Sequence, residues 1–117
     1  MEINALLEII RATLDDKKGQ NITIIDVIGR TSITDYMIVV TGTSNRHLKS
    51  LSDYVIEKVR ETAGLKPLGV EGDQGSDWVL LDLGDIIVHI MTEQSREYYQ
   101  LEKLWSVPAP AETQKSG

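Results

Sequence analysis

Cysteine is absent from the 117-residue sequence, which excludes disulfide bonds, thiol chemistry and a thiolate metal site. The sequence also lacks any apolar run of the roughly 18 residues that a membrane-spanning helix needs. Histidine is scarce, and a zinc site built on His47 and His89 would need carboxylates from distant segments. Because residues 1–4 do not resemble a signal peptide, we expect a cytoplasmic protein with no metal, no cofactor and no membrane partner.

The sequence also has fewer basic than acidic residues. The chain has 12 lysine and arginine residues against 18 aspartate and glutamate residues, so its formal net charge at pH 7 is −6. An acidic surface repels the phosphate backbone of nucleic acids, and we therefore expect no direct DNA binding. Such a surface favours a basic partner instead, for example a ribosomal protein or a histone.

Three segments show the apolar spacing of i, i+3 and i+4 that is typical of a helix with one buried side. Helix caps and a glycine stop signal support the assignment. The expected helices are one from Ile3 that closes at Lys17-Lys18-Gly19, one from Ser44 or Asn45 to Gly64, and one from Thr92 or Glu93 that aligns Tyr98, Leu101 and Trp105 on one side.

Segments rich in β-branched residues predict strands between these helices. The expected strands are residues 22–28, residues 35–40, a short edge strand at 67–70 and a hairpin at 77–91. This order predicts an α/β fold, a single domain over residues 1–105 with a mixed β-sheet. The tail at 106–117 is rich in proline, alanine and polar residues, and we expect it to be disordered.

The hairpin segment DWVLLDLGDIIVHIM turns at Gly84-Asp85, a two-residue turn signal between two apolar runs. The turn sets the register, so alternate residues of both strands share a face. One side, which we call the aliphatic face, holds Val79, Leu81, Leu83, Ile86, Val88 and Ile90. The other side, which we call the mixed face, holds Trp78, Leu80, Asp82, Ile87, His89 and Met91.

Two interpretations of the mixed face stay open. Its tryptophan, methionine, histidine and aspartate give it a composition closer to a protein interface than to a core. Alternatively, a helix covers this face as well, and the indole N–H and His89 find their hydrogen-bond partners inside the domain.

The stretch VVTGTSNRHL, residues 39–48, combines a strand, a glycine, hydroxyl side chains and a helix N-terminus, as many phosphate-binding segments do. However, it lacks the further glycines and the lysine of known nucleotide loops. Asp82 and Asp85 are three residues apart and would not share a face, as Mg²⁺ ligation requires. We therefore expect Ser44 to be a helix cap and the chain not to be an enzyme. A nucleotide-binding enzyme or sensor that uses Gly42–His47 remains the alternative.

Several long motifs resemble those of the Iojap family, the ribosomal silencing factors. The similarity covers about residues 3–105 and keeps the order of the motifs. They are DYMIVVTGTSNRH at 35–47, GVEG at 69–72, the hairpin at 77–91, SREYY at 95–99 and LEKLW at 101–105.

The resemblance implies a fold related to nucleotidyltransferases that lacks their catalytic carboxylates. It also implies a translational repressor that binds the large ribosomal subunit through the fourteenth-numbered protein of that subunit. Bound there, the repressor blocks joining of the small subunit and lowers translation under nutrient limitation, and relatives are often homodimers when free. Carried over by position, the partner-binding residues would be Trp78, Leu80, Ile87, His89 and Met91, with Asp77 and Asp82 meeting basic side chains and Tyr98 or Tyr99 at the border.

Overall fold

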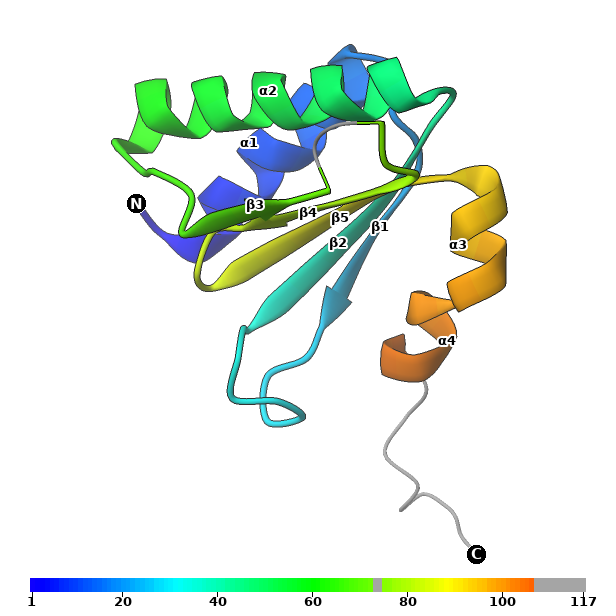
Figure 1. Cartoon of the computed structure of the whole chain (residues 1–117). Coiled ribbons are helices and arrows are strands. Elements are labelled where there is room, and N and C mark those ends of the chain that lie inside the picture. The colour runs from blue at the N-terminus through cyan, green and yellow to red at the C-terminus, as the bar shows by residue number, and fades with distance from the viewer. Residues whose placement is uncertain (73–74, 107–117) are drawn as a thin grey trace, which may run out of the picture.

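The strands of the protein form a mixed sheet of order β1-β2-β5-β4-β3 in the computed structural model, which describes residues 1–72 and 75–106 (Figure 1). Helices lie on both sides of this sheet. The bounds of the elements are α1 Ile3–Asp16, β1 Gln20–Asp26, β2 Tyr36–Gly42, α2 Asn45–Ala63, β3 Gly69–Glu71, β4 Trp78–Asp82, β5 Ile86–Thr92, α3 Glu93–Tyr99 and α4 Leu101–Ser106.

Strand pairing confirms the α/β class and the mixed sheet. β2 and β5 run parallel, whereas β1 with β2, β4 with β5 and β3 with β4 are antiparallel. β3 lies at the edge of the sheet, in agreement with the edge strand expected near Pro67. The register predicted for the hairpin is confirmed: Trp78 pairs with Met91, Leu80 with His89, and Asp82 with Ile87.

The main core lies between the aliphatic face and helices α1 and α2, which pack against each other on that side of the sheet (Figure 1). All six residues of the aliphatic face are buried. Fully burying one such side chain contributes about 1.5–3 kcal/mol, so this layer is the chief source of stability. The other buried members are Ile38 and Val40 from β2, Leu7, Ile10 and Leu14 from α1, and Leu48, Leu51, Val55 and Val59 from α2.

Two residues fix the ends of α2 as the sequence predicts. The Ser44 hydroxyl accepts a hydrogen bond from the backbone N–H of His47 at 3.1 Å, which makes Ser44 the N-cap. Gly64 ends the helix with a φ of 63°, in the left-handed region that glycine adopts without strain. The connection from β2 into α2 is therefore set by local capping.

The C-terminal helical segment differs from the expected single helix. Gln100 adopts a left-handed conformation with a φ of 51°, and this breaks the segment into α3 and α4. Leu101 and Trp105 pack against the sheet, whereas Tyr98 is 79% exposed, so the predicted stripe of all three is wrong. Ser106, expected to begin the tail, is the last residue of α4, and the rest of the predicted disordered tail lies outside the described residues.

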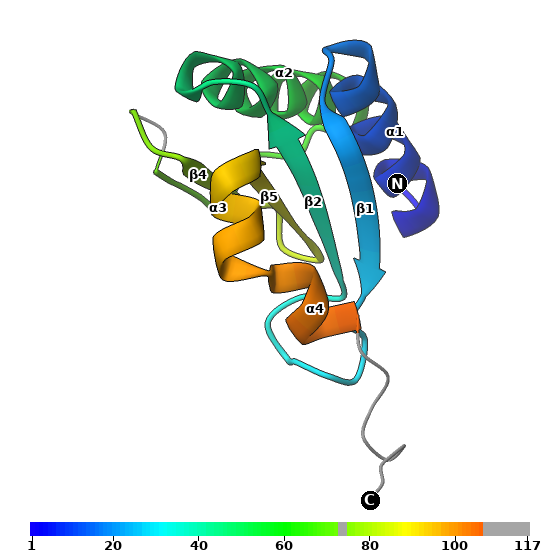
Figure 2. The same cartoon turned by 90° about the vertical axis from the view of Figure 1, so that its right-hand side faces the viewer.

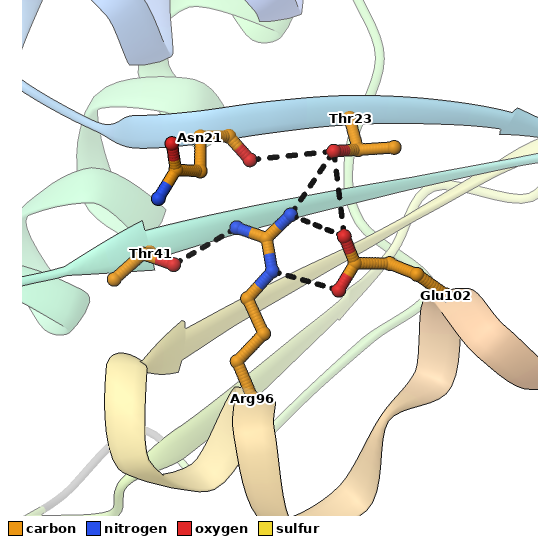
Figure 3. A network of polar contacts seen from close by, with 5 residues as sticks. All are labelled: Asn21, Thr23, Thr41, Arg96 and Glu102. Carbon is orange, nitrogen blue, oxygen red and sulfur yellow. Dashed lines mark hydrogen bonds and ion pairs between the residues drawn. The ribbon is translucent and has the colours of Figure 1, made fainter.

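Arg96 of α3 ties both short helices to the sheet (Figure 3). Its guanidinium donates to both carboxylate oxygens of Glu102, at 2.6 and 2.9 Å. It also donates to the hydroxyls of Thr41 in β2, at 2.8 Å, and Thr23 in β1, at 3.0 Å. The hydrogen bonds from Arg96 lower the pKa of the Glu102 carboxyl. This network holds α3 and α4 on the side of the sheet opposite α1 and α2 (Figure 2).

Candidate functional site

The mixed face is covered over one part and open over another. Near β1 and β2, Leu101 and Trp105 of α4 pack against a second, smaller core cluster. Nearer β4, the face is hollowed by a cavity of about 960 Å³, which we call the concavity. A helix therefore covers one part of this face, as the second interpretation expects, and the other part is open. The buried cluster consists of Ile25, Val27, Met37, Val39 and Met91.

The concavity has apolar and aromatic walls with acidic side chains among them. Met37, Leu80 and Ile87 contribute apolar surface, and the rings of Trp78, Tyr99 and Trp105 also line it. The carboxylates of Glu71, Asp77 and Asp82 belong to the same lining, and none of the three forms an ion pair with a described residue. Their negative charge is therefore not neutralised within the described part of the chain.

The structure brings most of the expected partner-binding residues together. The prediction for Met91 is wrong, because Met91 is fully buried, belongs to the second cluster and does not line the concavity. α4 covers that end of the mixed face, so Met91 offers no surface to a partner. The other expected partner-binding residues all line the concavity: Trp78, Leu80, Ile87, His89, Asp77 and Asp82.

Trp78 and His89 form a hydrogen-bonded pair within this lining. The indole N–H of Trp78 donates to Nδ1 of His89 at 3.1 Å, and the ring of Tyr99 lies 4.7 Å from that of Trp78. Burial lowers the pKa of His89 to about 4, so its imidazole is neutral at neutral pH. Trp78 is half-buried by these contacts, and its indole N–H has its hydrogen-bond partner inside the domain.

Several lining residues were not predicted from the sequence, among them Met37, Glu71 and Trp105, and Tyr99 was left undecided. Met37 of β2 lies beside Ile87 of β5 in the parallel register, a pairing that no local sequence signal reveals. Trp105 reaches the concavity because the helix breaks before α4. Of the two tyrosines proposed for the border, Tyr99 lines the concavity and Tyr98 is exposed.

Hydrogen bonds inside the Gly42–His47 turn engage donors that a bound phosphate would need. The backbone N–H of Thr43 donates to Nδ1 of His47 at 2.9 Å, and the N–H of His47 donates to the Ser44 hydroxyl. A Cβ on Gly42 would lie 2.5 Å from Cδ2 of Leu48, so glycine is needed here for close packing of strand and helix. The geometry of the turn favours a structural connection.

The start of α2 also carries negative charge from a neighbouring loop. The side-chain amide of Asn45 donates to the Asp77 carboxylate at 2.7 Å and to the carbonyl oxygen of Ser76 at 2.9 Å. A carboxylate beside a helix N-terminus already interacts with the positive end of the helix dipole, and so it competes with any other anion for that position. Within residues 1–72 and 75–106, no group of three or more His, Asp or Glu side chains is placed to hold a metal ion, and no helix is long and apolar enough to cross a membrane.

Fold and site together define a class of small α/β protein: α1 and α2 pack on one sheet face, and the other face offers an apolar concavity with acidic side chains. A family model described as "Ribosomal silencing factor during starvation" matches residues 1–116. The chain belongs to this family, as the sequence motifs predict.

Individual relatives agree with this assignment. The chain is 48% identical over 102 residues to ribosomal silencing factor RsfS of Haemophilus influenzae, which covers 87% of this chain and 99% of that protein. It is 31% identical over 106 residues to the mouse protein named mitochondrial assembly of ribosomal large subunit protein 1, which covers 86% of this chain and 45% of that protein. A crystal structure of a protein from Chromobacterium violaceum matches with a TM-score of 0.86 at 39% identity, over 100% of this chain and 92% of that one.

Proposed function

We propose that the protein is a translational repressor that binds the large ribosomal subunit through the fourteenth-numbered protein of that subunit. Bound there, it sterically prevents joining of the small subunit and lowers translation under nutrient limitation. The observation that carries this proposal is the acid-lined apolar concavity in a member of the ribosomal silencing factor family. The name of the mouse relative, which refers to assembly of the ribosomal large subunit, supports the choice of subunit.

The chemistry of the concavity suits a segment of a basic protein. Leu80 and Ile87 offer apolar surface, whose removal from water favours association. Asp77 and Asp82 attract lysine and arginine side chains, and the net charge of −6 adds a long-range attraction for a basic surface. An RNA backbone would meet repulsion from the same charges, so we propose contact through protein.

A charged substitution in the concavity tests the proposal directly. Leu80→Glu is expected to weaken binding to isolated large subunits at least about tenfold, because a carboxylate would be desolvated in the contact. Leu68→Glu is the matched control, since Leu68 is 75% exposed and lies outside the concavity. Co-sedimentation with large subunits measures binding, and a subunit-joining assay measures repression.

Two results would contradict the proposal. If the unsubstituted protein neither sediments with large subunits nor prevents joining, it is not a repressor of this kind. If Leu80→Glu is folded and binds as well as Leu68→Glu, the contact surface lies elsewhere on the molecule.

The proposed repressor acts without catalysis and without a cofactor. The engaged N–H donors of the Gly42–His47 turn support this choice over a nucleotide-binding enzyme or sensor. Calorimetric titration with nucleotides, with and without Mg²⁺, is expected to show no saturable binding in the micromolar range. Saturable binding that Ser44→Ala abolishes would favour the enzyme or sensor.

We also propose that the free protein is a homodimer in the cytoplasm. This follows from the family resemblance, and the concavity gives each copy an apolar surface that a second copy or the ribosome could cover. Light scattering is expected to give a mass near twice the chain mass of 13.1 kDa. A monomeric mass at all concentrations would contradict the dimer without affecting the proposed ribosome contact.

A further inference from the structure

His89 is a polar residue among the apolar residues that run from Ile86 to Met91 in β5, and its ring belongs to the lining of the concavity. In the sheet it lies between Leu80 of β4 and Val39 of β2. Its surface is only 6% exposed. A polar ring in such surroundings costs free energy unless both ring nitrogens have hydrogen-bond partners.

The contact with Trp78 determines which nitrogen of His89 carries the proton. An indole N–H is a donor and never an acceptor, so Nδ1 of His89, 3.1 Å away, must accept and cannot be protonated. Burial keeps the imidazole neutral, with its pKa lowered to about 4. The one proton of the neutral ring therefore sits on Nε2, which makes Nε2 a hydrogen-bond donor.

This donor has no acceptor in the described part of the chain. Across residues 1–72 and 75–106, the hydrogen bond to Trp78 is the polar contact that His89 makes. His47 offers an internal comparison, because Thr43 donates to its Nδ1 and its Nε2 lies 2.9 Å from the carbonyl oxygen of Lys17. The two histidines have the same tautomer, but only His47 uses both ring nitrogens within the domain.

We propose that the Nε2–H group of His89 donates a hydrogen bond to a main-chain carbonyl oxygen of the protein segment that binds in the concavity. Trp78 is then a positioning residue, which holds the imidazole in the tautomer that donates. This inference rests on the proposed function and assigns the polar contact within the surface described there.

The surroundings of His89 define the chemistry of the segment. Its acceptor is uncharged, because a carboxylate or phosphate would be repelled by the nearby Asp77, Asp82 and Glu71. The side chains beside the acceptor are apolar, to match Leu80 and the aromatic rings, and flanking lysine or arginine residues meet the acidic side chains. A loop or strand end with a free carbonyl group meets these requirements.

The tautomer is measured first, on the free full-length chain. Long-range ¹H–¹⁵N correlation spectra at pH 7 are expected to show His89 with a protonated Nε2 and an unprotonated Nδ1. Trp78→Phe removes the indole donor and should give a mixture of both tautomers at His89, while the tautomer of His47 stays unchanged. A protonated Nδ1 in the unsubstituted protein, or an unchanged His89 tautomer in Trp78→Phe, would overturn the inference.

Binding to isolated large subunits is measured next. His89→Leu removes the donor and is expected to weaken binding about tenfold, whereas His89→Gln places an amide N–H near the position of Nε2 and should bind within about threefold of the unsubstituted protein. Trp78→Phe should weaken binding in proportion to the fraction of His89 that loses the Nε2 proton. His47→Gln is the matched control outside the concavity and should bind normally. Thermal melts establish that each variant is folded.

The outcomes separate this inference from the proposed function. If the unsubstituted protein binds and folded His89→Leu binds equally well, the donor role is wrong and the docking surface stands. If His89→Leu does not fold, His89→Gln tests the donor role instead. Loss of binding by folded His89→Gln then contradicts that role. If the His89 variants lose binding to whole subunits and keep binding to the purified fourteenth-numbered protein, the acceptor belongs to RNA and the assignment to a protein carbonyl is wrong.

Discussion

A single buried histidine couples the stability of this fold to pH. Above pH 6.5, the ordinary pKa of the side chain, His89 is neutral in both the folded and the unfolded chain. Between that value and the lowered pKa of about 4 in the folded protein, only the unfolded chain binds the proton. Acidification across this range therefore favours unfolding, by about 3 kcal/mol at pH 4 relative to pH 7.

Denaturant unfolding of the unsubstituted protein and of His89→Gln measures this effect. Carboxylates titrate in the same range in both proteins, so the difference between the two curves isolates His89. We expect the free energy of unfolding of the unsubstituted protein to fall more steeply between pH 6.5 and pH 4. Parallel curves would mean that His89 is protonated as readily in the folded chain as in the unfolded one.

Ser44 is expected to act only through the stability of α2. Ser44→Ala removes the hydroxyl that accepts from His47 N–H and should lower the free energy of unfolding by about 1 kcal/mol. Binding to large subunits should not change, because Ser44 lies outside the lining of the concavity. A variant with normal stability and impaired binding would assign Ser44 to a contact surface.

Among the elements, α3 and α4 depend on the polar network of Arg96 for their place on the sheet. Arg96→Met keeps the aliphatic stem but removes the ion pair with Glu102 and the hydrogen bonds to Glu102, Thr23 and Thr41. We expect a loss of about 2 kcal/mol in stability and faster amide hydrogen exchange in α4. Lys103→Met, on the exposed side of α4, is the matched control. Equal exchange rates in the two variants would show that apolar packing alone holds α4.

The elements also show how far the sequence predicts this structure. The hairpin register and the ends of α2 follow from local signals, since Gly84-Asp85 sets the turn and Ser44 and Gly64 cap the helix. The cover over Met91 does not follow, because it depends on a left-handed residue that is not glycine, Gln100, and on contacts made across the sheet. Local patterns predict the elements and the site on a single hairpin, whereas the boundary between open and covered surface is a long-range property.

For the whole molecule, the excess of negative charge predicts a salt effect on the rate of association. A net charge of −6 attracts a basic ribosomal surface over distances that dissolved ions screen. Between about 50 mM and 300 mM salt, the association rate constant with large subunits should fall several-fold, and the dissociation rate constant should change much less. Surface plasmon resonance on immobilised subunits measures both constants. An association rate that does not depend on salt would show that the charge is incidental.

The alternation of β4 and β5 between two faces has a consequence for how such a protein diverges. Val79 and Leu81 point into the layer beneath α1 and α2, while Trp78, Leu80 and Asp82, which alternate with them along β4, line the concavity. A substitution at one of these positions therefore meets one set of neighbours and leaves the other largely untouched. Selection for a foldable chain and selection for a given docking partner therefore act on alternate residues of the same hairpin. A lineage, or a protein engineer, could change the partner by rewriting every second residue of this hairpin while the scaffold that carries it is inherited intact.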